Sequence, residues 1–277
     1  MNTLLVALLA AAPLQVEAIN AGPNGFLVTS TLITGEKEAV LVDAQMTLSD
    51  AHRLAAKVLE SGKALTTIFV SHAHPDHYFG LEVLKTAFPG AKIVAAPKVV
   101  EEAKATGAAK LAYWKPMIGA NLASAVVIPT VFAEKSFELE GQKIELITID
   151  NGESDAATAF WIPSTQTLIA GDAVYDGVHA WLADAATQAR RDTWLKNLAT
   201  LKALKPKTVV GGHRSPDAKS TVEAIDAEVT YVKDFSAAVA KSKTPEELTV
   251  AVTAKHGALA LPVILDIAAK ASVPAKK

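Results

Sequence analysis

Three histidines and an aspartate stand within six residues of one another, in the run His72-Ala73-His74-Pro75-Asp76-His77. Because His72 and His74 lie two residues apart directly after an apolar stretch, an extended backbone would point both imidazoles the same way, and they could share one metal ion. Asp76 and His77 could then bind a second ion. Two ions held roughly 3.5 to 4 Å apart activate a bridging water and stabilise the oxygens of a hydrolytic step. A polar surface loop would not need this set of residues, so the run favours a two-metal hydrolase.

Three more candidate ligands each follow an apolar stretch that reads as a strand. Asp172 and His213 come directly after glycines, and Glu153 lies in the turn Asn151-Gly152-Glu153-Ser154. Each could be ordinary turn chemistry by itself. Because binding sites draw on several loops at one edge of a rigid scaffold, the three together with the histidine run predict one shared site. Asp172 could bridge both ions through its two carboxylate oxygens. The strands that precede these ligands are expected over 143–149 for Glu153, 167–170 for Asp172 and 208–210 for His213.

The composition limits the chemistry and the partners. The chain has 277 residues and no cysteine, so any metal must be bound by histidines and carboxylates, and cysteine nucleophiles are excluded. Its net charge of -2 with interspersed signs gives no basic stripe for a nucleic acid. A small-molecule substrate fits better. The sequence gives no indication of the oligomeric state.

The N-terminal segment, residues 1–18, reads either as a secretory signal or as a first segment that packs on the core. Met1 to Ala12 is apolar and ends in small residues, but no Lys or Arg precedes the apolar stretch. A signal would imply a periplasmic or secreted protein, and its absence a cytoplasmic one. Neither this segment nor any later one is long and apolar enough to span a membrane, so no membrane partner is expected.

The elements that must position these ligands alternate between strands and helices. A hairpin over 25–34 and 39–43 is followed by β-then-α alternation to about residue 118, then by a second run of strands from 126 to 170. Thr244 and Glu247 form a capping box that opens a final helical pair, 244–273, a C-terminal extension of a single domain over 1–277. The remaining expected helices cover 51–60, 81–87, 97–118, 188–204 and 218–241, and the remaining strands 65–70, 92–96, 126–131, 136–139, 143–149, 158–162, 167–170 and 208–210. This order indicates an α/β (α+β) fold of packed layers.

The motifs His72-Ala73-His74-Pro75-Asp76-His77, Gly171-Asp172 and Gly211-Gly212-His213 resemble those of the metallo-β-lactamase superfamily over most of the chain. The resemblance implies a four-layer αββα sandwich with the site at its edge. It also implies that His72 and His74 bind the first metal, that Asp76, His77 and His213 bind the second, and that Asp172 bridges.

One motif departs from the family pattern. Where the family usually has Gly-His-Thr, this chain has Gly152-Glu153-Ser154, so Glu153 stands in the position of the third ligand of the first metal. A carboxylate there can bind zinc, which is the first expectation for both ions, but it also suits harder ions such as manganese or iron. The alternative is that Glu153 does not ligate and that the first site is weak.

The family implies hydrolysis through a metal-bridging hydroxide, and a small-molecule lactone, ester or amide, with β-lactams among the amides, is the first choice of substrate, so lactonase activity is one expectation. Asp76 and His179 are the candidate catalytic residues, Asp76 to orient the nucleophile or pass a proton and His179 as a pocket residue, with a loop histidine as the alternative for the latter. Three other functions remain open: a phosphodiesterase or phosphotriesterase, a redox di-iron protein, and a non-catalytic binding protein of the same fold.

Overall fold

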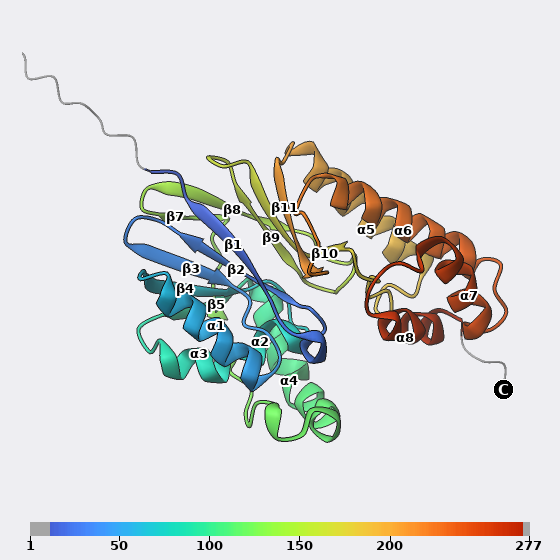
Figure 1. The fold of residues 1–277 in the computed structure, drawn as a ribbon, viewed down its shortest axis with the longest axis horizontal. Coiled ribbons are helices and arrows are strands. Elements are labelled where there is room, and N and C mark those ends of the chain that lie inside the picture. Colours follow the sequence, from blue (N-terminus) through green and yellow to red (C-terminus); the bar gives the residue numbers. More distant parts are fainter. Residues whose placement is uncertain (1–11, 274–277) are drawn as a thin grey trace, which may run out of the picture.

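Two β-sheets pack face to face and carry helices on their outer sides in a computed structural model that describes residues 12–273 (Figure 1). The chain crosses from the first half, drawn in blue to green, to the second half, drawn in yellow to red. This arrangement confirms the predicted αββα sandwich. The described residues include no helix that is long and apolar enough to cross a membrane.

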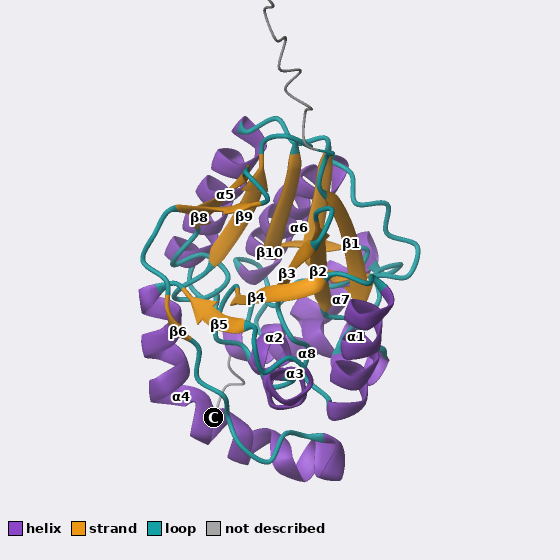
Figure 2. Cartoon of the chain, turned by 90° about the vertical axis from the view of Figure 1, so that its left-hand side faces the viewer, coloured by secondary structure: helices purple, strands orange, loops and turns teal. Residues whose placement is uncertain are grey.

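The first sheet has the strand order β1-β2-β3-β4-β5-β6. β1 to β3 are antiparallel, whereas β3 to β6 run parallel, since helices rather than tight turns connect them (Figure 2). Parallel strands end at one edge of the sheet, which places the residues after β4 there. The strands are β1 (Gln15–Asn20), β2 (Thr29–Thr34), β3 (Glu38–Val42), β4 (Ala64–Val70), β5 (Lys92–Ala95) and β6 (Thr130–Val131).

The second sheet has the order β11-β10-β9-β8-β7. Only β10 and β11 are parallel, joined through helix α5. Its strands are β7 (Ser136–Leu139), β8 (Gln142–Thr148), β9 (Thr158–Ile162), β10 (Thr167–Asp176) and β11 (Thr208–Arg214).

Alternating side chains on the strands build separate cores on the two faces of each sheet. In β3, Val40 and Val42 enter the core between the sheets, while Leu41 faces the helices. In β9, Phe160 enters the same central core and Trp161 packs under the second helical layer. The period of two along each strand therefore produces the four layers.

The helices cover the outer faces. Helices α1 (Leu48–Glu60), α3 (Leu81–Ala87) and α4 (Pro97–Ile118) pack on the first sheet, and α5 (Gln188–Ala203) and α6 (Glu223–Val239) on the second. Thr47 caps α1 by accepting a hydrogen bond from the Asp50 backbone N–H, so this helix begins earlier than the expected Ala51. Helix α6, in contrast, begins at Glu223, later than the expected Ala218.

Several expected strand boundaries were wrong. The strand expected from residue 25 begins at Thr29, because Pro23–Gly25 forms a 3-10 turn, and the strand expected over 208–210 continues to Arg214. The strand predicted over 126–131 is reduced to Thr130–Val131, because Val126 and its apolar neighbours pack on the α4 core rather than pairing in a sheet. β10 continues past Ala170 to Asp176, with a register shift around Gly171, whose φ of +53° glycine tolerates. Asp172 therefore lies inside a strand rather than after one, and the same holds for His213 in β11.

The C-terminal helices are α7 (Pro245–His256) and α8 (Pro262–Ser272). As predicted, Thr244 accepts a hydrogen bond from the Glu247 N–H at the start of α7. The segment between the helices is tied to the loop after β10 by hydrogen bonds between Ala260 and both Gly177 and His179. Most of the expected signal, residues 1–11, and the tail 274–277 lie outside the described residues.

Candidate metal centre

The histidine run forms the turn between β4 and a short helix, α2 (Pro75–Tyr78). His72 and His74 are extended, and His74 is the last residue before the helix begins at Pro75. Asp76 and His77 belong to the helical turn and project in another direction. This change of backbone conformation divides the run between two clusters of ligand atoms.

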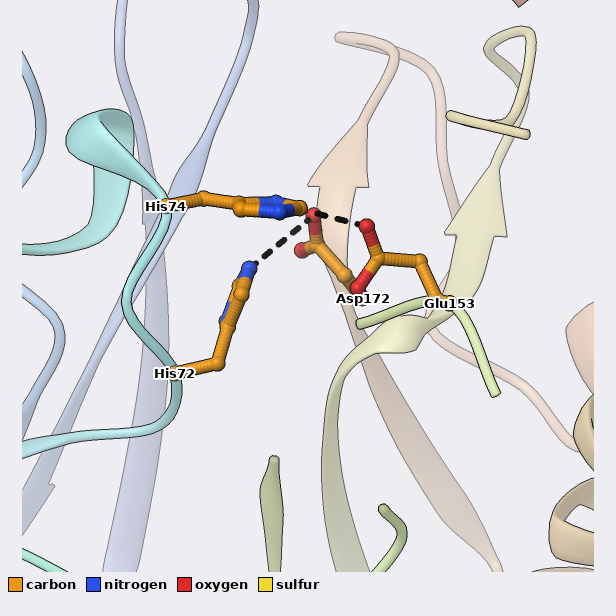
Figure 3. A group of neighbouring side chains, drawn as sticks. All are labelled: His72, His74, Glu153 and Asp172. Carbon is orange, nitrogen blue, oxygen red and sulfur yellow. Dashed lines mark ion pairs between the residues drawn. The ribbon is translucent and has the colours of Figure 1, made fainter. Parts of the chain in front are cut away.

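The first cluster contains His72, His74, Glu153 and Asp172, with one ligand atom of each within 4.8 Å of all the others. Figure 3 shows the two histidines arriving from one side and the two carboxylates from the opposite sheet. His74 Nδ1 lies 3.3 Å from Glu153 Oε1, and His72 Nε2 lies 3.7 Å from Asp172 Oδ2. Glu153 thus reaches the place expected of a third ligand from the loop between β8 and β9.

The second cluster contains Asp76, His77 and His213. His213 Nε2 lies 3.2 Å from Asp76 Oδ2. Asp172 lies between the clusters, because its Oδ1 is 3.1 Å from His77 Nε2 and its Oδ2 is 3.3 Å from His213 Nε2. The structure therefore brings together all seven of the residues that the sequence proposed as ligands.

Gly212 makes room for Asp172 at this point. A Cβ at position 212 would lie 1.9 Å from Asp172 Oδ1 and 2.6 Å from the Gly171 carbonyl carbon. The carboxylate consequently packs directly against the backbone of β11. Positions 211 and 212 are glycines because the backbones of β10 and β11 lie close together here, and not because the chain turns.

Each histidine uses its second ring nitrogen in a hydrogen bond to the protein. His213 Nδ1 donates to the Phe26 carbonyl at 2.7 Å, and His77 Nδ1 donates to Asp43 Oδ2 at 2.7 Å. A carbonyl or carboxylate oxygen accepts in each case, so the histidine donates through Nδ1 and its Nε2 faces the cluster.

Asp43 also fixes the first histidine of the run. Its two oxygens accept from the Ser71 N–H and hydroxyl, each at 2.7 Å. Since the Ser71 hydroxyl donates to Asp43, it accepts from His72 Nδ1, 3.0 Å away. A single buried aspartate thereby orients a ligand in each cluster, a role that the sequence did not predict.

Asp184 has the corresponding role for His74. Its Oδ2 lies 3.0 Å from His74 Nε2 and accepts a 2.8 Å hydrogen bond from the indole of Trp181. His74 therefore donates through Nε2 and presents Nδ1 to the cluster. Asp184 was also missed, because it follows Asp172 by twelve residues with no motif around it.

The unsatisfied atoms of the clusters fit divalent metal ions. His72 Nε2, His77 Nε2, Asp172 Oδ1 and both Glu153 oxygens are buried and have no hydrogen-bond partner among the described residues. Buried polar atoms without partners cost free energy, and bound metal would satisfy them. The donor set of four imidazoles and three carboxylates suits zinc, manganese or iron.

The carboxylates of the centre differ in their acidity. Burial raises the pKa of Glu153 to about 8, and the charge of His74 offsets only part of that effect. Burial opposes the ionisation of Asp172 as well, but His77 and His213 outweigh it and hold the pKa of that carboxyl well below its usual range. Glu153 is thus the carboxylate that depends most on a nearby positive charge for its ionised form.

Tyr175 is a further polar group at the centre. Its hydroxyl donates to Asp172 Oδ2 at 2.8 Å, and its ring stacks on that of His213 with an angle of 8° between the planes. Burial, and next the charge of Asp172, raise the pKa of Tyr175 well above its usual value, so the hydroxyl stays protonated. Tyr175 was not among the expected site residues, although its place three residues after Asp172 was a usable signal.

His179 does not join this group. It is buried, its Nδ1 lies 2.8 Å from the Tyr231 hydroxyl, and it is absent from the described lining of the main cavity. The structure instead places it among the contacts that hold the segment before α8.

A cavity of about 580 Å³ opens onto the centre. The ligands His74, Asp76, Asp172 and His213 form part of its wall, and Tyr175 lies beside them. This volume is in the range of small-molecule sites. Two clusters of candidate ligands, with Asp172 lying between them at the floor of such a cavity, could therefore bind metal ions in this αββα fold.

Comparison with known proteins identifies the family. The family model of the metallo-beta-lactamase superfamily matches residues 23–213, and the chain belongs to this superfamily. A metallo-beta-lactamase family protein from Thermus thermophilus superposes with a TM-score of 0.63 at 20% identity, covering 90% of this chain and 91% of that one. A metallo-beta-lactamase from Pontibacter korlensis gives 0.60 at 17% identity, covering 81% and 97%. At these identities the structures share the fold, and no curated protein matches the sequence.

Proposed function

We propose that the protein is a dinuclear metal-dependent hydrolase of a small-molecule lactone, ester or amide. The observation that carries the proposal is the position of Asp172 between two ligand clusters, at the floor of a cavity of substrate size. Zinc is the first choice for both ions. Glu153 in the first cluster makes manganese or iron the alternative there.

In this proposal His72, His74 and Glu153 would hold one ion, Asp76, His77 and His213 would hold the other, and Asp172 would serve both. Two such ions, when bound, would polarise a carbonyl and lower the pKa of a bound water towards neutrality. Asp76 is the ligand carboxylate with its side chain partly open to the cavity, so it can orient the attacking water and accept its proton. The Tyr175 hydroxyl, on the same wall, donates its single proton to Asp172 Oδ2 and would thereby hold that carboxylate in place between the two clusters.

Metal analysis and a substrate screen together test the proposal. Protein purified without added metal is expected to contain two equivalents of zinc or manganese and to cleave members of a panel of lactones, esters, amides, β-lactams and phosphodiesters. Stoichiometric redox-active iron would instead favour the di-iron alternative. A fully metallated protein that cleaves nothing in the panel would contradict the hydrolase proposal.

A further inference from the structure

The cavity is lined by two kinds of surface. The ligands of the metal centre form its floor, and the rest of its lining belongs to other elements. The opposite wall is formed by one face of α4, with Thr106, Lys110 and Tyr113 at positions i, i+4 and i+7, and by Ile264 and Ile267 of α8. These two helices come from distant parts of the sequence. The apolar surface around them is extended by Phe26, Met46, Trp114 and Trp181.

This apolar wall is ordered by contacts between its aromatic side chains. The rings of Phe26 and Trp114 meet edge to face at 5.5 Å, and those of Tyr113 and Trp114 at 5.4 Å. Tyr113 is nevertheless 67% exposed, which places it at the mouth of the cavity. A wall of aromatic and branched side chains that leads from solvent to the metal centre suits an elongated apolar group.

The cations at the cavity are already paired. Lys110 is the only Lys or Arg among the described lining residues, and its ammonium donates to the Ala73 carbonyl at 2.8 Å and to Glu102 Oε1 at 3.1 Å. Arg190, which lies behind Asp155, is engaged by that carboxylate and by the Gly152 carbonyl. The described wall therefore offers carboxylates, including Asp184, but no unengaged cation to a negatively charged substrate.

We infer that the substrate is an uncharged lactone or ester whose apolar chain or ring packs between α4 and α8 while its carbonyl lies at the metal centre. This inference rests on the proposed function. An anionic group on the part of the substrate that packs on this wall, away from the proposed ions, would meet Glu102 and Asp184 without a free Lys or Arg among the described residues. The family match ends at residue 213, so the α8 half of this wall lies outside the matched region.

A series of 4-nitrophenyl esters from acetate to decanoate, hydrolysed by the metal-loaded enzyme, tests the apolar wall. We expect kcat/KM to rise about threefold per methylene until the cavity is filled. A matched pair, the octanoate and the mono-ester of octanedioate, tests the charge. The octanedioate, which ends in a carboxylate, should react at least about tenfold less efficiently. A flat chain-length series, or equal rates for the pair, would overturn the inference.

Two variants of α8 localise the effect. Ile267→Glu places a charge on the cavity wall, whereas Val263→Glu places the same charge on the same helix at an exposed residue that does not line the cavity. The ratio of kcat/KM for octanoate to that for acetate should fall at least about tenfold in I267E and stay at the wild-type value in V263E. An unchanged ratio in I267E, or an equal fall in both variants, would contradict the α8 contact.

A binding measurement separates this inference from the proposed hydrolysis. Two of the four tryptophans, Trp114 and Trp181, line the cavity, so titration with 1-decanol should change the tryptophan fluorescence saturably. I267E should bind decanol more weakly than wild type does, and V263E should bind it as wild type does. If decanol binds in this way but no ester is cleaved, the hydrolase proposal fails and the apolar wall stands. If esters are cleaved but decanol does not bind, the hydrolase proposal stands and the apolar-wall inference fails.

Discussion

The two ligand clusters differ in how firmly the protein holds their side chains. In the second cluster, His77 is oriented by Asp43, whose side chain is only 2% exposed, and His213 by a backbone carbonyl. In the first cluster, His74 is oriented by Asp184, which is 49% exposed, and Glu153 has no hydrogen-bond partner among the described residues.

This difference in support predicts how tightly each cluster binds its ion and which metals it accepts. Ligands fixed by buried partners need little rearrangement to bind metal, so the second cluster is preorganised. The first cluster draws on two loops and replaces a neutral imidazole by a carboxylate. We therefore expect the second cluster to bind its ion more tightly and the first to exchange its ion more readily and to accept harder metals.

The largest effect should come from the residue that the clusters share. Asp172→Asn should lose tight binding of both ions and lower kcat/KM roughly 10²- to 10³-fold, because it removes a charge that both ions use. Metal analysis after dialysis checks this. Asp176→Asn, in the same strand and outside the clusters, should retain both equivalents. Retention of two ions in the Asp172 variant would show that the clusters are independent.

Glu153→Ala should remove the ion of the first cluster and leave one equivalent in the second. The loss is expected because Glu153 supplies the only carboxylate that the first cluster does not share. Glu153→Gln, which keeps an oxygen donor, should bind the ion with intermediate affinity. If Glu153→Ala kept its full metal content and activity, Glu153 would not be a ligand, and the two clusters would differ only in how their histidines are held.

Asp43→Asn should weaken the second cluster about 10- to 100-fold in metal affinity, because His77 loses the acceptor that fixes its ring. The first cluster should weaken less, because Asp43 holds His72 only through the Ser71 hydroxyl. Ser71 loses an acceptor as well, so the variant should also unfold more easily, by about 1 to 3 kcal/mol. Calorimetric metal titration and thermal denaturation measure the two effects. Affinity lost only at the first cluster would reverse the assignment of Asp43.

Asp184→Ala should weaken only the first cluster, by about tenfold, because the orienting carboxylate is half exposed. Asp155→Ala is the matched control, since Asp155 also lines the cavity but pairs with Arg190. A loss of metal affinity as large as that of the Asp43 variant would show that the two clusters hold their ligands equally firmly.

The smallest effect should come from His179, which belongs to neither cluster. Burial lowers the pKa of His179 to about 4. The unfolded chain, with its ordinary histidine pKa, therefore takes up a proton first, and the folded state loses stability as the pH falls from about 6.5 to 4. His179→Gln should remove that part of the pH dependence, on the order of 3 kcal/mol, and leave the metal content unchanged. Denaturation midpoints between pH 7 and pH 4 test this, with the exposed His52→Gln as the control. If stability fell with pH as steeply in His179→Gln as in wild type, the lowered pKa of His179 would not be the cause of the pH dependence.

The candidate ligands could be picked out because their chemistry is local in sequence. The run from His72 to His77 combines a strand end and a helical turn within six residues. Asp172 and His213 each follow a glycine, and the glycine before His213, Gly212, keeps the backbones of β10 and β11 close. Apolar alternation likewise predicted most strands and the two-sheet fold.

The residues that hold the ligands or line the cavity were not predictable, because they act on residues far away in the sequence. Asp43 reaches His77 over 34 residues, and the α8 residues reach the cavity from a helix beyond the family match. Buried acids without a motif look like ordinary turn residues. The bulge at Gly171 had no signal besides the glycine itself, so the sequence predicted the end of β10 at Ala170 rather than at Asp176.

Gly212 gives a way to read other sequences of this kind. Because any side chain at that position would overlap the carboxylate of Asp172, a chain that keeps the aspartate in this place must also keep the glycine. An alanine there would indicate that the aspartate has moved or that the strands pair in a different register. A residue with no donor atom is therefore a marker, readable from sequence alone, for the geometry of the metal ligand on the neighbouring strand.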